Sequence, residues 1–265
     1  MTRLKLIASD LDGTLLLDGA QELNENTCTL IRKLTDAGIL FTAASGRQYA
    51  NLQRLFAPVK DEIAYICENG CLSFYRDECI CFEQMDESLA HDLISAVSEK
   101  EGCEVLVSGK KTSWICPKDM SYYRHMKDVV HNHVTLTDDL HHIPEPYFKI
   151  SLYQKGGLTD VSDWTERFSG RCNVSVGGTE WLDMMPAGVS KATAFSALLK
   201  KLDIRAEDTV VIGDNENDRE ILQAAGIPAA VRSARSDIKS ICRYETDTVE
   251  NLLEKLIDDP DFLFR

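Results

Sequence analysis

Short apolar runs alternate with amphipathic segments along the first 80 residues of this chain. The runs "LKLIAS", "ILFTAAS" and "IAYIC" predict strands, because they are brief, apolar and rich in β-forming residues. The segment "NENTCTLIRKLTDAG" predicts a helix opened by Asn24 and closed by Gly38, and "YANLQRLF" predicts a second one. This β-α-β-α-β order predicts right-handed crossovers and a parallel sheet.

The same rhythm returns near the end of the chain. "TVVIGD" and "PAAV" predict strands, and "DREILQAAG" predicts a helix ended by Gly226. The segment "SKATAFSALLKKLD" predicts a longer helix, and one of its faces holds Ala192, Phe195, Leu198, Leu199 and Leu202. Together the two ends predict an α/β fold with a doubly wound parallel sheet.

The middle of the chain has a different character. Residues 84–187 hold the histidines, the tryptophans and the polar stretch "HNHVTLTDDLHHIP". We predict an inserted α+β domain there, linked to the rest near Glu83–Met85 and Pro186–Ser190. The catalytic core would then comprise residues 1–83 and 188–265.

Composition narrows the range of partners. The formal net charge of −14 disfavours nucleic acid and anionic membranes as partners. The start "MTRLKLIASD" does not resemble a signal peptide, and no apolar run reaches the length of a membrane span. Nine cysteines fit reduced thiols and predict a cytoplasmic protein. Four of them lack zinc-site spacing and are interpreted as small buried hydrophobic residues, namely Cys67, Cys71, Cys79 and Cys81.

Candidate chemistry lies where the predicted strands end. Parallel strands present their carboxyl ends at one rim of the sheet, where ligands bind. Asp10, Asp12, Ser45 and Asp214 all fall at that rim, and Lys191 opens the helix after the insertion. Because clustered carboxylates repel one another, a hard divalent cation is expected among them, and Mg²⁺ is the ion that we predict.

Phosphoryl transfer is the reaction that suits this set. Ser45 offers a hydroxyl at a strand-to-helix turn suited to anions, and Lys191 offers a positive charge. Asp10 and Asp12 are two residues apart and project to the same side of an extended chain. One of them can attack phosphorus while the other protonates the leaving oxygen.

Four segments resemble the ordered motifs of haloacid dehalogenase-like phosphatases: "DLDGTLL", "SGR", the lysine of "GVSKATA" and "GDNENDREIL". The long insertion is similar to the large α/β cap of the Cof-type subfamily (subfamily IIB). The resemblance implies a Rossmann-like core in which the nucleophile is Asp10 and Asp12 is the acid and then the base. It places Mg²⁺ on Asp10, on the backbone carbonyl of Asp12 and on Asp214. It implies a phosphate site formed by Leu11, Ser45, Gly46, Lys191 and Asn217.

Two further residues receive supporting roles. The resemblance implies that Asp218 supports Lys191 or the waters of the metal, whereas Arg47 stays open between a role near the ligand and a structural ion pair. Trp181 and Asp183 could face the ligand or pack the cap, and packing is the favoured interpretation. The remaining candidates are interpreted as polar cap surface, namely His125, His131, His133, His141 and His142.

We therefore expect a Mg²⁺-dependent phosphatase that hydrolyses small phosphorylated metabolites through an aspartyl phosphate. Sugar phosphates are the leading substrate class, and the protein is expected to be a monomer or a homodimer. Two alternatives stay open: a phosphomutase of the same superfamily, and a non-catalytic metabolite-binding sensor.

Overall fold

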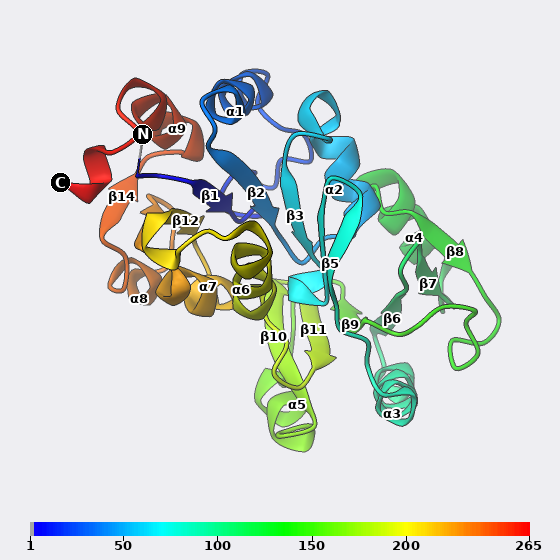
Figure 1. Cartoon of the computed structure of the whole chain (residues 1–265). Helices are drawn as coiled ribbons and strands as arrows, with labels where there is room; N and C mark the ends of the chain where they lie inside the picture. Colours follow the sequence, from blue (N-terminus) through cyan, green and yellow to red (C-terminus); the bar gives the residue numbers. More distant parts are fainter. Residues whose placement is uncertain (1–2) are drawn as a thin grey trace.

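A computed structural model describes residues 3–265 and contains two β-sheets with separate apolar cores (Figure 1). The larger sheet has eight strands in the order β14-β13-β12-β1-β2-β3-β4-β5. Its strands are β1 (Leu6–Ser9), β2 (Leu40–Ala44), β3 (Ala64–Cys67), β4 (Leu72–Tyr75), β5 (Glu78–Phe82), β12 (Thr209–Gly213), β13 (Ile227–Val231) and β14 (Tyr244–Thr246). The α/β fold predicted from the sequence is confirmed.

Helices cover both faces of this sheet (Figure 1). Leu6 and Ile7 illustrate the two faces, because successive residues of β1 point into different apolar clusters. One face packs against α1 (Thr27–Asp36), α2 (Tyr49–Leu55) and α9 (Val249–Asp258). The other packs against α6 (Lys191–Leu202), α7 (Arg219–Ala224) and α8 (Ser236–Lys239).

Two local details differ from the sequence prediction. Helix α1 begins at Thr27 rather than near Asn24, because the Asn24 side chain accepts a hydrogen bond from the backbone of Asn26 and forms a turn before the helix. The sheet is also not purely parallel. β4 runs antiparallel to β3 and to β5, and the β4–β5 turn holds Arg76 and Asp77 at positive φ. That turn lacks the glycine that usually marks such a hairpin.

The second sheet is formed within residues 84–187, which we call the cap. Its strand order is β10-β11-β9-β6-β7-β8, and its pairs are antiparallel except for β7 with β8. Its strands are β6 (Cys103–Ser108), β7 (Ser113–Ile115), β8 (Val134–Leu136), β9 (Lys149–Gln154), β10 (Cys172–Gly178) and β11 (Trp181–Pro186). Its helices are α3 (Glu87–Glu99), α4 (Met120–Arg124) and α5 (Val161–Arg167), and a π-helical turn (His125–Val129) follows α4.

The cysteines carry free thiols, and several of them are buried. Within residues 3–265 the nine cysteines are all unpaired thiols, and Cys67, Cys71 and Cys81 are buried. The burial of these three agrees with their interpretation as small buried residues, whereas Cys79, also expected to be buried, is only partly so. Among the described helices, none has the length and apolar character needed to cross a membrane.

Candidate active site

Two neighbouring strands bring Asp10 and Asp214 together. β1 and β12 are parallel partners, and Asp10 and Asp214 follow their carboxyl ends. The backbone N–H of Asp10 donates to the carbonyl of Ile212 at 2.9 Å, which fixes the position of Asp10 at the rim. The sheet register therefore places the two carboxylates side by side.

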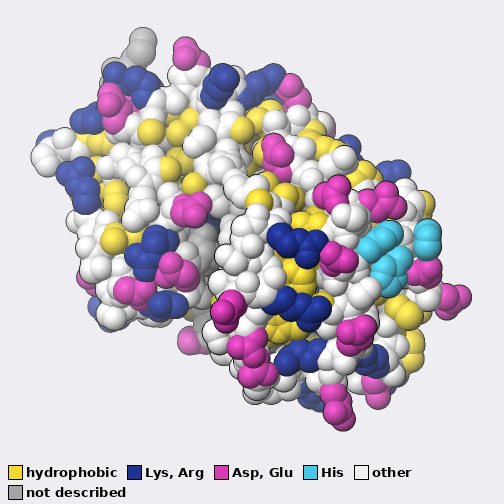
Figure 2. Space-filling view, turned by 90° about the horizontal axis from the view of Figure 1, so that it is seen from below, with side chains coloured by type: hydrophobic (Ala, Val, Ile, Leu, Met, Phe, Trp, Pro, Cys, Tyr) yellow, Lys and Arg dark blue, Asp and Glu magenta, His cyan; other side chains and the backbone are white. Residues whose placement is uncertain are grey.

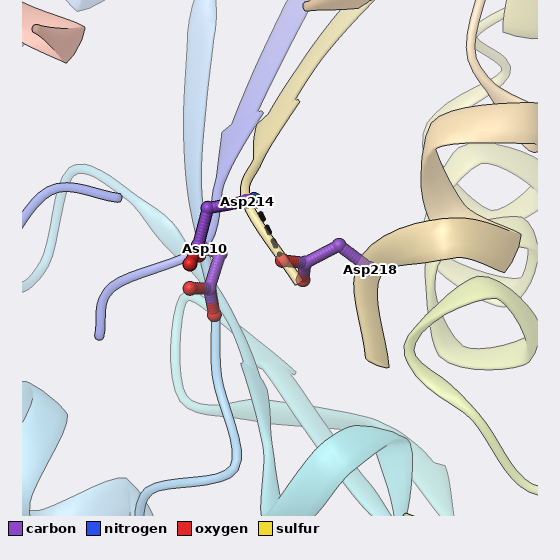
Figure 3. Close-up of side chains that lie close together, drawn as sticks. All are labelled: Asp10, Asp214 and Asp218. Carbon is purple, nitrogen blue, oxygen red and sulfur yellow. Dashed lines mark hydrogen bonds between the residues drawn. The ribbon is translucent and has the colours of Figure 1, made fainter. Parts of the chain in front are cut away.

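A third carboxylate completes the cluster. Oxygen atoms of Asp10, Asp214 and Asp218 lie within 4.8 Å of one another, and their side chains converge in Figure 3. Asp218 also accepts a hydrogen bond from the backbone N–H of Asp214 at 3.1 Å, drawn as the dashed line in that figure. The hydroxyl of Thr14 donates to Asp214 at 2.6 Å. Asp218, which was predicted to support Lys191 or the waters of the metal, contacts Lys191 at 2.7 Å and also lies in the cluster.

Lys191 lies against two of these carboxylates. Its ammonium group is 2.6 Å from Oδ1 of Asp10 and 2.7 Å from Oδ1 of Asp218, and the residue is only 1% exposed. Burial opposes the charge, but attraction by Asp10 and Asp218 outweighs it and raises the pKa of Lys191 above its ordinary value. Lys191 is therefore a permanent cation at neutral pH.

One ammonium group does not balance three carboxylates. Burial raises the pKa of Asp10 well above its ordinary value, repulsion by Asp218 adds to this effect, and Lys191 only partly offsets it. Burial likewise raises the pKa of Asp214, against the hydrogen bond from Thr14. The cluster thus has two negative charges in excess when ionised. A divalent cation with oxygen ligands fits both the charge and the donor atoms.

Gly13 allows the chain to pass this close to Asp214. Its φ is +90°, and a Cβ atom there would lie 2.5 Å from Oδ2 of Asp214. Any side chain at position 13 would push on a carboxylate of the cluster. The glycine after the paired aspartates is therefore required for close approach as well as for the turn.

Asp12 points away from the cluster toward Arg47. The Arg47 guanidinium donates to both carboxylate oxygens of Asp12, at 2.9 and 2.6 Å. The Asp12 side chain is therefore not part of the three-carboxylate cluster. For Arg47, which sequence analysis left open, the structure shows an ion pair within the site.

A cavity of about 450 Å³ lies between the core and the cap. Predicted site residues in its wall are Asp10, Asp12, Ser45, Gly46, Arg47 and Asn217. Ser45 accepts a hydrogen bond from the backbone N–H of Arg47 at 3.1 Å, so its own hydroxyl hydrogen can point elsewhere. Leu11, Lys191 and Asp218 are buried beneath this surface. Six of the predicted residues therefore line one cavity, and Lys191 contacts one of them, Asp10.

A buried ion-pair network in the same wall was not predicted. Lys149, at the start of cap strand β9, has its ammonium 2.7 Å from the carbonyl of Gly46, 2.9 Å from Glu68 and 3.2 Å from Asp183. Asn69 donates to Asp183 at 2.7 Å. Three donors of one ammonium thus meet acceptors from both the core and the cap, which ties the cap to the loop that carries Gly46.

The turn after β3 has a strained backbone that presents two of these residues. Glu68 and Asn69 are consecutive non-glycine residues with φ of +49° and +55°. Gly70 follows with φ of +105°, and a Cβ atom there would overlap the carbonyl of Ser190. Strained turns of this kind concentrate at functional sites. Asp10 was predicted because it follows the carboxyl end of a parallel strand. The same reasoning applies to Glu68 and Asn69, which follow the third parallel strand. Lys149 has no such local signal.

Two sequence interpretations require correction. Trp181 and Asp183 were expected to pack the cap, but both line the cavity, although Trp181 also packs on Tyr153 at a centroid distance of 4.8 Å. His125 was expected on the polar surface, yet it lines the cavity and stacks on Tyr153. The register of β11 beside β9 and the π-helical turn direct these side chains inward.

The other cap histidines agree better with a surface position. His142 is 80% exposed at its side chain and pairs with Asp139, which also contacts His141. Figure 2 shows histidine side chains gathered in one group on the face it displays, in keeping with the ring contacts of His91 with His141 and His142.

Comparison with known proteins places this geometry in a family context. The model of the haloacid dehalogenase-like hydrolase family matches residues 7–252. The chain is 26% identical to the 5-amino-6-(5-phospho-D-ribitylamino)uracil phosphatase YbjI of Escherichia coli, over 91% of this chain and 90% of that protein. It is also 26% identical to phosphoglycolate phosphatase 1 of Saccharolobus solfataricus, over 96% of each chain.

Solved structures resemble the fold over nearly its whole length. A haloacid dehalogenase-like hydrolase from B. subtilis superposes with a TM-score of 0.83 at 21% identity, covering 97% of this chain and 99% of the other. The subclass IIB sugar phosphatase BT4131 superposes with a TM-score of 0.80 at 20% identity, covering 95% and 98%. At these identities the likeness concerns the fold.

Proposed function

Because this chain belongs to the haloacid dehalogenase-like hydrolases and is a phosphatase of that family, we propose that it hydrolyses phosphate monoesters of small metabolites with Mg²⁺, through a phosphoenzyme on Asp10. The observation that carries the proposal is the position of Asp10. Its carboxylate contacts the Lys191 ammonium at 2.6 Å, belongs to the three-carboxylate cluster and faces the cavity. A nucleophile, a fixed positive charge and a metal-binding set thus share one point.

The metal would be held by Asp10, by Asp214 and by the backbone carbonyl of Asp12, with Asp218 beside them. When bound, Mg²⁺ would neutralise charge on the phosphoryl oxygens of the substrate. The Lys191 ammonium, the Ser45 hydroxyl and the Asn217 side chain would hold the remaining oxygens, and the backbone at Leu11 and Gly46 would line the same phosphate site. Asp218 would keep Lys191 in place through its contact of 2.7 Å.

In the first half-reaction, an oxygen of Asp10 attacks phosphorus and the bond from phosphorus to the ester oxygen breaks. Asp12 gives its proton to that departing oxygen, so the product leaves as an alcohol. In the second half-reaction, a water molecule attacks phosphorus and Asp12 takes a proton from that water. The bond between phosphorus and the Asp10 oxygen breaks, and its electron pair stays on Asp10. Inorganic phosphate then leaves and the carboxylate is restored.

Sugar phosphates and related polyol phosphates are the substrate class that we propose. The cavity wall also carries hydrogen-bonding side chains suited to hydroxyl groups, including Gln21, Asn132 and Glu180. The name of the relative YbjI refers to a phosphorylated ribityl chain, and the structural neighbour BT4131 is named a sugar phosphatase. The cap would exclude bulk water during the reaction and open for product release.

The decisive experiment measures phosphate release across a panel of phosphorylated metabolites and an aryl phosphate. We expect steady multiple-turnover release that vanishes in Asp10→Asn, a variant of nearly unchanged shape. Transfer of phosphate between positions of a sugar, without release, would instead indicate a phosphomutase. Binding without turnover in the presence of Mg²⁺ would indicate a sensor and would contradict the proposal.

A further inference from the structure

Two amide side chains of the core hold the cap next to the Ser45–Gly46–Arg47 loop. Gln48 accepts a hydrogen bond from the backbone N–H of His133 at 3.0 Å and donates to the carbonyl of that residue at 3.3 Å. Asn51 donates to the carbonyl of Val130 at 2.7 Å. Gln48 and Asn51 are 3% and 1% exposed, and helix α2 lies beside the cap segment that follows α4 (Figure 1). Both amides therefore bind the cap in its observed position.

Asn51 differs from Gln48 in a second contact. Its Oδ1 atom accepts a hydrogen bond from Nη1 of Arg47 at 3.2 Å, while its Nδ2 atom donates to the cap. The orientation of the amide is fixed chemically, because a guanidinium can only donate and a carbonyl can only accept. For Gln48, the side-chain hydrogen bonds within residues 3–265 go to His133 and Ser113, both in the cap.

Arg47 carries this contact onward to Asp12. Its Nε and Nη2 atoms donate to the two oxygens of the Asp12 carboxylate at 2.9 and 2.6 Å. A two-pronged contact of this kind fixes the plane of a carboxylate as well as its position. Asp12 needs such a support, since its side chain is 46% exposed and follows the end of β1. The hydrogen bonds thus run without a break from the cap through Asn51 and Arg47 to Asp12.

We propose that Asn51 is a positioning residue that makes the orientation of Asp12 depend on closure of the cap. This inference rests on the proposed function, in which Asp12 takes a proton from the water that attacks the phosphoenzyme. When the cap is in place, the Val130 carbonyl holds the Asn51 amide so that its oxygen faces Arg47, and Arg47 holds Asp12. Hydrolysis of the phosphoenzyme is then fast only while the cap excludes bulk water.

The test compares two nearly isosteric variants, Asn51→Leu and Gln48→Met, with an aryl phosphate as substrate. Both lose hydrogen bonds to the cap, so both should lower kcat/KM. Only Asn51→Leu also removes a hydrogen bond from Arg47, whose guanidinium keeps its contact with Gln21, so only this variant should slow the step that needs Asp12 as a base. Because an aryl group leaves without help, its phosphoenzyme forms normally and then accumulates. We expect a burst of phenol release, trapped phosphoprotein after acid quench, and a kcat about tenfold or more below that of Gln48→Met.

A conservative variant separates the two contacts of Asn51. Asn51→Asp keeps an oxygen for Arg47 but cannot donate to Val130, so we expect a raised KM without the burst. Asn51→Ala serves as the second amide-free variant if Asn51→Leu does not fold. Equal kcat in Asn51→Leu and Gln48→Met, with no burst in either, would overturn the inference while leaving the proposed function intact. Failure of the parent protein to release phosphate from any substrate would instead overturn the proposed function.

Discussion

The ammonium nitrogen of Lys191 lies 2.6 Å from Oδ1 of Asp10, although the two residues are 181 positions apart in the chain. The contact is buried, so water screens it little. It joins the first strand of the core to the helix that follows the cap. Stability and reactivity therefore depend on the same pair of atoms.

Replacement of Lys191 by methionine tests this dependence. Lys191→Met leaves Asp10 and Asp218 buried without their cation, so the free energy of unfolding should fall by about 3 kcal/mol or more. Phosphatase activity should be lost. Mg²⁺ should raise the melting temperature of the variant more than that of the parent, because a dication can replace part of the missing charge. Thermal unfolding with and without Mg²⁺ measures both effects.

A matched control lies on the same helix. Lys201 pairs with Glu78 at the surface, where the two side chains are 47% and 57% exposed. Lys201→Met should change the free energy of unfolding by no more than about 1 kcal/mol. Comparable losses in the two variants would show that burial of the Lys191 pair is not what stabilises the fold.

Metal binding should release protons. Burial and the repulsion of Asp218 raise the pKa of Asp10, so in the metal-free protein this carboxyl keeps its proton to a higher pH than an ordinary aspartate does. Since Mg²⁺ binds only the ionised form, its apparent affinity should increase as pH rises toward and past that raised pKa. Calorimetric titration in two buffers of different ionisation enthalpy counts the protons. Equal heats in the two buffers would contradict the prediction.

Removal of the metal by a chelator should also affect phosphatase activity. Excess chelator should abolish turnover, and added Mg²⁺ should restore it, whereas Ca²⁺ should restore it poorly because it accepts more and looser ligands. Such expansion would let Asp10 bind the ion through both oxygens and lose its attacking lone pair. Full turnover in chelator would refute a metal-dependent mechanism.

Replacement of Asp10 and replacement of Asp12 should reduce phosphatase activity in different ways. Asp10→Asn removes the nucleophile, so turnover should vanish with every substrate. Asp12→Asn removes the proton donor and should slow an alkyl phosphate by about 10²–10⁴-fold, with a smaller loss for an aryl phosphate, whose phenolate departs unaided. Steady-state rates with matched alkyl and aryl esters give the comparison. Identical losses for both leaving groups would show that Asp12 is not the acid.

Lys149 should be required for the junction between core and cap. Lys149→Met leaves Glu68 and Asp183 buried without a cation, and the free energy of unfolding should fall by about 3 kcal/mol. Loss of the contact with the Gly46 carbonyl should also raise KM. Lys100→Met is the control, because its partner Asp160 is exposed and the pair is on the cap surface. Denaturant unfolding of the two variants distinguishes them, and similar midpoints would argue against the network.

Local patterns predicted much of the core. The alternation of short apolar runs and amphipathic segments identifies β1, α1, β2, α2 and β3, because each element is specified by its own periodicity. The β4–β5 hairpin was not predicted, because its turn has Arg76 and Asp77 in a left-handed conformation and lacks the glycine that usually indicates such a turn. Asp10 and Asp214 were found because both follow strands at one rim of a parallel sheet.

The parts of the site that were missed depend on packing between distant elements. The contact of Lys149 with Glu68 and Asp183 requires the register of β9 beside β11 and the seating of the cap on the core. Neither condition leaves a mark near Lys149 in the sequence. The pairing of Arg47 with Asp12 is similar, since it depends on how two loops from adjacent strands face each other.

Gly70 has a consequence for the interpretation of inherited variation. It lies outside the cavity wall, yet any side chain at this position would collide with the Ser190 carbonyl, one residue before Lys191. A substitution there would displace the start of α6 and move the ammonium away from Asp10. A survey of variants would then record Gly70 as intolerant of substitution and suggest that it contacts the substrate. The actual constraint is the space that the chain needs at Ser190, where it returns from the cap to the core.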